Sequence, residues 1–235
     1  MDKNTFKFKQ FEVDQTGCAM RVNTDGVLLA ALANGDEFEH ILDIGTGTGV
    51  MALMLGQRYP HAKIHAVEID AAAAKTAERN FRNSPFQNRL SISHTAIEQY
   101  ATLQQFDLII SNPPYFINDL RSAEERKGIA RHANIQFFKD LAIKIDELLS
   151  PSGYFWFILP IKQAELLINE ASVYGLSISK QIILYSDQSK PPFRWLIGLT
   201  RFKNEAEITH FYIYETEKVY TDAYKKLLKD FFLGY

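Results

Sequence analysis

Apolar residues along the chain alternate between the spacing of buried strands and the spacing of amphipathic helices. Short, nearly continuous apolar runs predict strands at 40–45, 63–70, 89–95, 106–111 and 154–160. Helical spacing or alanine-rich sequence predicts helices between them at 50–59, 71–81, 135–149 and 161–173. Strands that alternate with helices indicate an α/β fold with a doubly wound, mostly parallel sheet covered on both faces.

The C-terminal third follows a different pattern. Three β-rich stretches at 177–185, 193–202 and 208–215 have no helix between them, and a helix is expected at 221–232. Strands without helical connectors favour an antiparallel C-terminal hairpin at one edge of the sheet. We therefore expect a seven-stranded sheet in a single domain over residues 1–235, with residues 1–38 as a short N-terminal extension.

Composition narrows the class of protein. Hydrophobic residues make up 46% of the chain and charged residues 23%, which is ordinary for a globular protein. No run approaches the ~18 apolar residues of a membrane span, and the N-terminus has no apolar signal segment. Cys18 is the only cysteine, which excludes a disulfide framework and a cysteine-based zinc site. We expect a cytoplasmic protein, favoured as a monomer, with no metal site.

Charge gives a mixed indication about nucleic acid. The net charge of −2 argues against strong binding to a polyanion. Two stretches are nevertheless basic: residues 121–144 carry six basic and three acidic side chains, and residues 188–204 carry four basic side chains and no acid. Either stretch is also compatible with ordinary solvated surface.

A glycine-rich loop is the first candidate for chemistry. The stretch ILDIGTGTGV places Gly45, Gly47 and Gly49 directly after the strand at 40–45 and at the start of the next helix. Glycine permits positive φ and close approach of a ligand to the backbone. The N–H groups of a helix N-terminus suit an anion, and open α/β sheets bind ligands at this edge.

The spacing of these glycines discriminates between ligands. A dinucleotide fingerprint, G-x-G-x-x-G, would need glycine where Val50 stands, which disfavours a nicotinamide dehydrogenase. The observed D-x-G-x-G-x-G, led by Asp43, resembles the first motif of class I S-adenosylmethionine-dependent methyltransferases. Glu68 closes the second strand and matches their ribose-binding acid. The alternative is a tight turn followed by a surface acid.

This resemblance implies a Rossmann-like fold and S-adenosyl-L-methionine as cofactor, with S-adenosyl-L-homocysteine as product. Many class I enzymes also carry an acid after the third strand, in contact with the cofactor adenine. Here residues 94–98 read HTAIE. The acid is therefore either absent or displaced to Glu98, and Ala96 is the cofactor-binding residue expected in this stretch.

The stretch SNPPYF follows the strand at 106–111 and is stiffened by two consecutive prolines. Asn112-Pro113-Pro114-Tyr115 resembles the signature of amino-group methyltransferases. An exocyclic amino group is a poor nucleophile because its lone pair is delocalised. The Asn112 side-chain oxygen and the Pro113 carbonyl are expected to accept its two hydrogens and stabilise the developing positive charge. Tyr115 is expected to stack on the planar target.

Further stretches make the resemblance more specific. RVNTDGVLL at 21–29, the later Ala130-Arg131-His132 and the closing YTDAYKKLLKDFFL are similar to the bacterial tRNA1(Val) (adenine-N6)-methyltransferase family. The similarity spans nearly the whole chain. It implies methylation of the adenosine immediately 3′ of the anticodon and places Thr24 near the cofactor. An ordinary helix N-cap remains the alternative for Thr24.

A tRNA partner requires contacts to flanking nucleotides, because the target base must be turned out of its stack. The predicted substrate-binding residues share a position in one of the two basic stretches or next to the proline corner: Tyr115, Arg126, Arg131, His132, Lys190 and Arg194. His132 is equally compatible with a surface histidine.

Other functions use the same motifs. The alternatives among enzymes are a release-factor glutamine methyltransferase and an rRNA guanine-N2 methyltransferase. The former usually carries a larger N-terminal helical domain than the ~38 residues that precede the first strand here. A non-catalytic RNA-binding module on the same scaffold is the alternative from another class, and the intact set of motif residues argues against it.

Overall fold

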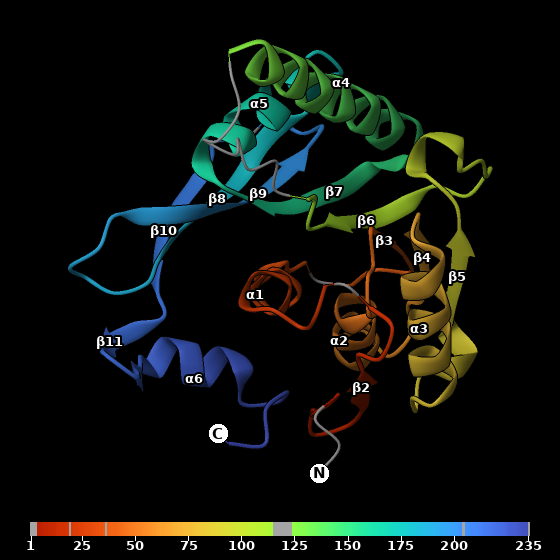
Figure 1. The fold of residues 1–235 in the computed structure, drawn as a ribbon, viewed down its shortest axis with the longest axis vertical. Coiled ribbons are helices and arrows are strands. Elements are labelled where there is room, and N and C mark those ends of the chain that lie inside the picture. Colours follow the sequence, from red (N-terminus) through yellow and green to blue (C-terminus); the bar gives the residue numbers. More distant parts are fainter. Residues whose placement is uncertain (1–3, 19, 36, 115–123, 204, 235) are drawn as a thin grey trace.

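The computed structural model describes residues 4–18, 20–35, 37–114, 124–203 and 205–234, with only the backbone of 124–134. Eight strands form one mixed sheet in the order β10-β8-β9-β7-β6-β3-β4-β5 (Figure 1). The strands are β3 (His40–Ile44), β4 (Lys63–Glu68), β5 (Leu90–His94), β6 (Phe106–Ser111), β7 (Leu149–Leu159), β8 (Ser177–Tyr185), β9 (Pro192–Thr200) and β10 (Glu207–Tyr212).

The five strands from β5 to β7 are mutually parallel, which confirms the expected fold class. The expected antiparallel hairpin is formed by β8 and β9, with β9 also antiparallel to β7. The sheet has one strand more than the seven expected. All eight β-rich stretches predicted from the sequence join this sheet, and the one expected at 208–215 forms β10, which pairs in parallel with β8 at the edge. After it the chain turns away into a separate two-stranded hairpin of β11 (Tyr214–Thr216) and β12 (Val219–Tyr220).

Helices cover both faces of this sheet (Figure 1). On one face lie α1 (Thr24–Leu32), α2 (Val50–Arg58), α3 (Ala71–Arg82) and α6 (Asp222–Leu228), and on the other lie α4 (Glu124–Leu148) and α5 (Ile161–Ser172). Successive side chains of β7 pack into the hydrophobic cores on the two faces of the sheet. Trp156 packs on the first face, and Phe155 and Phe157 pack on the second. This is the period of two that a strand covered on both faces requires.

Several boundaries differ from those expected. Helix α4 begins at Glu124, eleven residues before the expected 135, and α6 ends at Leu228 rather than 232. Residues 150–153, which lie between the predicted helix at 135–149 and the predicted strand at 154–160, belong to β7. A Cβ at Gly153 would lie 2.9 Å from the Phe106 carbonyl oxygen, so glycine lets the two backbones approach where the pairing is irregular. Local composition alone indicated a turn.

The N-terminal extension is a packed part of the molecule. An antiparallel hairpin of β1 (Thr5–Lys7) and β2 (Glu12–Asp14), which the sequence did not predict, precedes α1. Phe8 forms a bridge to Phe232, so the two ends of the described chain lie side by side (Figure 1). Helix α1 is buried over most of its length, from Asp25 to Ala31.

The parallel register brings three loops to one edge of the sheet. Ile44, the last residue of β3, is opposite Val67 of β4 and Ser111 of β6. The glycine loop, Glu68 and Asn112 follow these positions directly. The fold therefore gathers the chemistry-bearing segments at the carboxyl ends of adjacent strands, where open α/β sheets bind ligands.

Candidate functional site

The glycine loop between β3 and α2 adopts a backbone that ordinary residues disfavour. Gly45, Gly47 and Gly49 have φ values of +71°, +56° and +84°. A Cβ built at Gly45 or Gly47 would meet no atom within 4 Å, whereas one at Gly49 would lie 2.6 Å from the Phe81 ring. The first two glycines therefore keep the loop open to a ligand, and the third lets the loop pack closely on α3.

Asp43, near the end of β3, holds the start of this loop through hydrogen bonds. The residue is fully buried, and its Oδ2 accepts hydrogen bonds from Thr46 Oγ1 at 2.6 Å and from the Ala52 N–H at 3.2 Å. Its Oδ1 is buried and has no hydrogen-bond partner among the described residues. Burial raises the pKa of Asp43 to about 7, and the two hydrogen bonds oppose that rise.

Glu68 holds the glycine loop from the neighbouring strand. Its Oε2 accepts the Gly47 N–H at 2.8 Å, and its Oε1 accepts the Asp70 N–H at 2.9 Å. The side chain is buried, at 7% exposure, yet it lines the cavity beside the loop. A carboxylate oxygen has more than one lone pair, so Glu68 can accept ligand hydroxyls while keeping both backbone contacts.

A cavity of about 370 Å³ lies over the carboxyl ends of β3, β4 and β6. Its volume is within the range of small-molecule sites. The residues that line it include Gly45, Gly47, Glu68, Ala96, Glu98 and Asn112. A larger hollow of about 770 Å³ is formed by the loop at 186–190 and the β11–β12 hairpin, and it shares no lining residue with this cavity. Motif residues thus converge on the smaller cavity.

The proline corner follows β6 at the same edge. The Ser111 hydroxyl donates to the Ile44 carbonyl at 3.0 Å and fastens the end of β6 to the end of β3. Asn112, which is partly buried, lines both the cavity and a smaller hollow shared with Arg21 and the glycine loop. Pro113 is buried and Pro114 is exposed. Tyr115 lies outside the described residues.

Thr24 is not the N-cap of α1, which was the alternative to a place near the cofactor. The N-cap of α1 is Asn23, whose Oδ1 accepts the Gly26 N–H at 2.9 Å. Thr24 is the first helical residue and is exposed, and it does not line the cavity or the smaller hollow. Asn23 and Gly26 do line the smaller hollow. The N-terminal extension therefore reaches the glycine loop through the residues on either side of Thr24-Asp25.

The predicted substrate-binding residues are only partly described. Arg126, Arg131 and His132 lie on α4, but their side chains are outside the described part of the structure. Lys190 is exposed and forms an ion pair with Asp187 at 3.2 Å. Arg194 Nε pairs with Asp25 Oδ2 at 2.8 Å, which ties β9 to the start of α1. Arg194 thus has a structural partner, whatever else it contacts.

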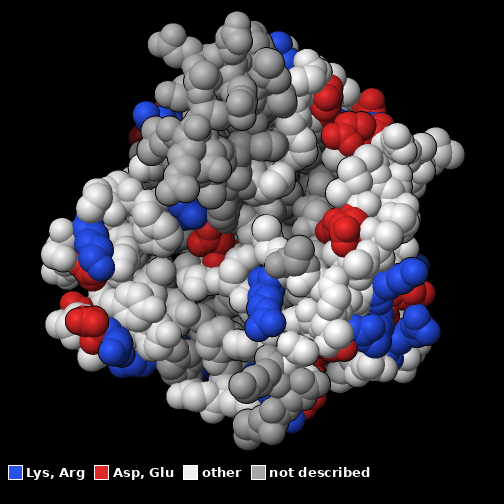
Figure 2. Space-filling view, in the orientation of Figure 1, with Lys and Arg blue, Asp and Glu red and all other residues white. Residues whose placement is uncertain are grey.

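The face seen in Figure 2 carries charges of both signs. One group of Lys and Arg side chains lies at the lower right, over the region of α3, and the other coloured side chains on this face are of mixed sign. No helix among the described residues is both long and apolar enough to cross a membrane. Among the same described residues, no group of three or more His, Cys, Asp or Glu side chains could hold a metal ion.

The cavity residues that were not predicted from the sequence include Cys18, Met20, Ile69 and Phe137. Ile69 is 70% exposed and Met20 is 51% exposed, although both are apolar. Ile69 could have been predicted as a cavity residue, because it is an apolar residue directly after the acid that ends β4. Cys18 and Met20 come from a segment far away in sequence, so only the tertiary structure brings them to the cavity.

Comparison with solved structures defines the class of protein. A predicted O-methyltransferase from Agrobacterium tumefaciens aligns with a TM-score of 0.68 over 88% of this chain and 96% of its own, at 19% identity. That identity supports the fold alone. The sequence profile of the methyltransferase small domain family matches residues 20–158. The chain therefore has the class I methyltransferase fold and belongs to the methyltransferase small domain family.

Sequence relatives narrow the assignment. A tRNA1(Val) (adenine(37)-N6)-methyltransferase of Pedobacter heparinus is 54% identical over 99% of this chain and 100% of its own length. The corresponding enzyme of Dyadobacter fermentans is 38% identical, over 98% of both chains. The chain belongs to the tRNA1(Val) (adenine(37)-N6)-methyltransferase family.

Proposed function

We propose that the protein transfers a methyl group from S-adenosylmethionine to N6 of adenine 37 in tRNA1(Val), the adenosine immediately 3′ of the anticodon. The observation that carries the proposal is that Asn112, Glu68 and the open glycines Gly45 and Gly47 line a single cavity. The near-full-length similarity to enzymes of that name supports the choice of substrate.

The residues present fit this cofactor. A Cβ at Gly45 or Gly47 would meet no protein atom, so the loop backbone is accessible to a ligand. The Glu68 carboxylate is suited to ribose hydroxyls, and the apolar Ile69 and Ile97 are suited to the adenine faces. Ala96 and Glu98 line the same cavity, and Glu98 offers an acceptor for an adenine amino group. Bound S-adenosylmethionine supplies an electrophilic methyl group on a sulfonium.

Asn112 and Pro113 carry the chemistry in this proposal. The Ser111–Ile44 hydrogen bond and two consecutive prolines hold the corner rigid. The Asn112 side-chain oxygen and the Pro113 carbonyl would accept the two hydrogens of the target amino group and so orient its lone pair for attack on an electrophilic methyl group. These acceptors stabilise positive charge as it develops on nitrogen, without reorganisation. The proton then leaves to solvent, and no obligatory base is required.

Recognition of tRNA is assigned to residues around this corner. Tyr115 would stack on the flipped adenine, and Arg126, Arg131 and His132 would contact flanking phosphates. Lys190 is on the loop between β8 and β9, and Arg194 is near the start of β9. Since β8 runs parallel to β7 and β9 runs antiparallel to both, this loop lies at the carboxyl edge of β7. A tRNA substrate also implies a cytoplasmic location. Asn23 and Gly26 make the segment around Thr24 part of the site's rim.

The test uses a transcript of tRNA1(Val) and labelled S-adenosylmethionine, followed by nucleoside analysis. We expect N6-methyladenosine in the wild-type transcript and none in a transcript with guanine at position 37. N2-methylguanosine, or label in a release-factor glutamine, would replace the proposal with one of the related amino-group activities. Binding of cofactor with no methyl transfer to any RNA would instead favour a non-catalytic RNA-binding role.

A further inference from the structure

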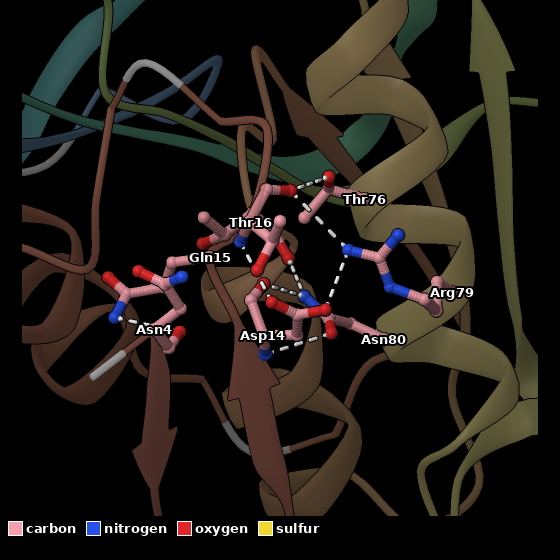
Figure 3. A network of polar contacts seen from close by, with 8 residues as sticks. Asn4, Asp14, Gln15, Thr16, Thr76, Arg79 and Asn80 are labelled. Atoms are coloured by element: carbon pink, nitrogen blue, oxygen red, sulfur yellow. Dashed lines mark hydrogen bonds and ion pairs between the residues drawn. The ribbon is translucent and has the colours of Figure 1, made fainter. Parts of the chain in front are cut away.

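Asn80, on α3, connects two segments that are distant in sequence. Its side chain is buried, at 2% exposure. The amide nitrogen donates to the carbonyl oxygens of Asp14 and Thr48, each at 2.9 Å, and the amide oxygen accepts the Asp14 N–H at 3.0 Å. Figure 3 shows the part of this network that joins β2 to α3. Both amide hydrogens of Asn80 are used, one toward the N-terminal extension and one toward the glycine loop.

On the glycine-loop side, Asn80 acts together with its neighbour. Thr48 is buried between Gly47 and Gly49, and the bond to its carbonyl orients the peptide that joins Thr48 to Gly49. Phe81 packs directly against Gly49, where a Cβ would lie 2.6 Å from its ring. Two consecutive residues of α3 therefore hold the loop, one by a hydrogen bond and the other by packing.

On the N-terminal side, three residues of α3 hold the turn that follows β2 (Figure 3). Besides Asn80, Thr76 Oγ1 donates to the Thr16 carbonyl at 2.8 Å, and Arg79 Nη2 pairs with Asp14 Oδ2 at 2.7 Å. The chain continues from this turn to Cys18 and Met20, which line the cavity. The position of the turn therefore determines where one wall of the cavity lies.

We propose that Asn80 is a positioning residue for the cofactor site: it fixes the glycine loop and the N-terminal wall in one relative arrangement. Among the described residues, the side-chain hydrogen bonds and ion pair of Thr76 and Arg79 reach the N-terminal turn, whereas those of Asn80 reach both segments. The alignment of the N-terminal turn, and of Cys18 and Met20 beyond it, with the glycine loop then depends on this one amide, because Thr76 and Arg79 hold only the turn. The ligand assignment rests on the proposed function, but the coupling between the two segments does not.

The first measurement is residue-level amide exchange on the full chain without cofactor. In the Asn80→Asp variant the amide donor is replaced by an oxygen that faces two carbonyls. We expect exchange to rise about tenfold at Thr16 in the N-terminal turn and at Gly47 and Gly49 in the loop. The matched control, Arg79→Gln, lies one residue away and should raise exchange in the turn only. Unchanged exchange at Gly47 and Gly49 in Asn80→Asp would overturn the coupling.

The second measurement is cofactor affinity and turnover. Asn80→Asp should raise the Kd for S-adenosylhomocysteine and the KM for S-adenosylmethionine by about tenfold, with kcat at saturating cofactor within about threefold of wild type. Arg79→Gln loosens only the turn, so it should raise both constants by a smaller factor, about two- to threefold. A purely structural role would lower the folded fraction without changing the Kd of the folded protein, and that result would refute the positioning role.

If Asn80→Asp does not fold, Asn80→Ser replaces it in both measurements. Its smaller side chain leaves room for water to bridge the same groups. It should shift exchange and Kd in the same direction by a smaller factor, and wild-type values for both would contradict the proposal. Failure of the proposed function is separately visible. In that case the wild-type protein itself binds neither cofactor form, while the exchange experiment still decides whether Asn80 couples the two segments.

Discussion

The Gly47 backbone N–H and the Glu68 carboxylate are joined by a hydrogen bond of 2.8 Å that crosses from the loop after β3 to the end of β4. The same carboxylate accepts the Asp70 N–H through its other oxygen. One buried acid therefore sets the position of the glycine loop and also presents lone pairs to the cavity. Any change at Glu68 should act on cofactor binding first.

Glu68→Gln should raise the Kd for S-adenosylhomocysteine by about 10–100-fold. The amide offers one acceptor instead of two, and hydrogen bonds to a charged group are worth about 1.5–3 kcal/mol. Turnover at saturating cofactor should change little, because the residue is remote from the reacting nitrogen in the proposed mechanism. Calorimetric titration measures the Kd. Glu98→Gln is the control on the same cavity, and an equal effect there would contradict a special role for Glu68.

Gly45→Ala and Gly49→Ala should separate binding from stability. At Gly49 an added Cβ would lie 2.6 Å from the Phe81 ring at a φ of +84°, so we expect a loss of about 2–4 kcal/mol in the free energy of unfolding. At Gly45 nothing lies within 4 Å, so the loss should be only the backbone strain of about 1–2 kcal/mol. Cofactor affinity should nevertheless fall in Gly45→Ala, since its Cβ occupies the ligand side of the loop.

Urea unfolding and cofactor titration together test this pair of variants. A stability loss in Gly45→Ala as large as in Gly49→Ala would contradict the asymmetry in packing. Unchanged cofactor affinity in Gly45→Ala would remove the loop backbone from the ligand-binding surface.

Asp43 should make stability depend on pH. Burial raises its pKa in the folded protein to about 7 from an ordinary value of 3.8, so the folded state binds the proton more tightly than the unfolded chain. The free energy of unfolding therefore has its full contribution from this group below pH ~4, falls as the pH rises toward ~7, and is level above that. The full change is on the order of 4 kcal/mol.

The measurement is the difference in unfolding free energy between wild type and Asp43→Asn at several pH values. Asparagine keeps an acceptor for Thr46 and Ala52 but does not titrate. The wild-type advantage should shrink by up to about 1.4 kcal/mol per pH unit between pH 5 and 7. Parallel stability curves for the two proteins would mean that Asp43 is ionised throughout that range.

Arg194→Met should destabilise the protein by about 1–3 kcal/mol, because it leaves the Asp25 carboxylate at the start of α1 without its 2.8 Å ion-pair partner. Both side chains are largely buried, at 21% and 12% exposure, so screening by solvent is limited. Denaturant titration measures the loss, and restoring stability by combining it with Asp25→Asn would confirm the pairing. Lys190→Gln, on an exposed loop, is the control and should leave the unfolding curve unchanged.

Asn112→Ala should lower kcat for tRNA methylation by ~10²–10³, the usual effect of removing one preorganised transition-state contact. The Kd for the cofactor should remain within a few-fold, since the glycine loop and Glu68 are intact. Single-turnover kinetics with saturating cofactor and tRNA measure this step. Near-normal turnover in the variant would exclude the amide as an acceptor for the reacting amino group.

Local patterns in the sequence were sufficient for the outline of the fold and for the cofactor-loop motif. Apolar periodicity located every parallel strand to within a few residues, apart from the start of β7. Glycine permits positive φ, and Gly45, Gly47 and Gly49 all adopt it. Such features depend on a residue and its near neighbours, so they can be read from one chain.

Boundaries failed where a distant segment overrode local preference. The Ser-Pro-Ser-Gly stretch at 150–153 reads as a turn, but pairing with β6 makes it part of β7. The sequence predicted a β-rich stretch at 208–215, but the parallel pairing of β10 with the edge strand β8 depends on a distant segment and has no local signal.

The sequence by itself determined the class of fold, the glycine loop, the acid at the end of the second strand and the proline corner, because each is encoded by adjacent residues. Only the tertiary structure decided which distant groups meet: Arg194 with Asp25, Asn80 with Thr48 and Asp14, and the N-terminal residues Cys18 and Met20 with the cavity. The physical reason is that such contacts depend on how packed helices and strands align in space, and local periodicity carries no record of that alignment.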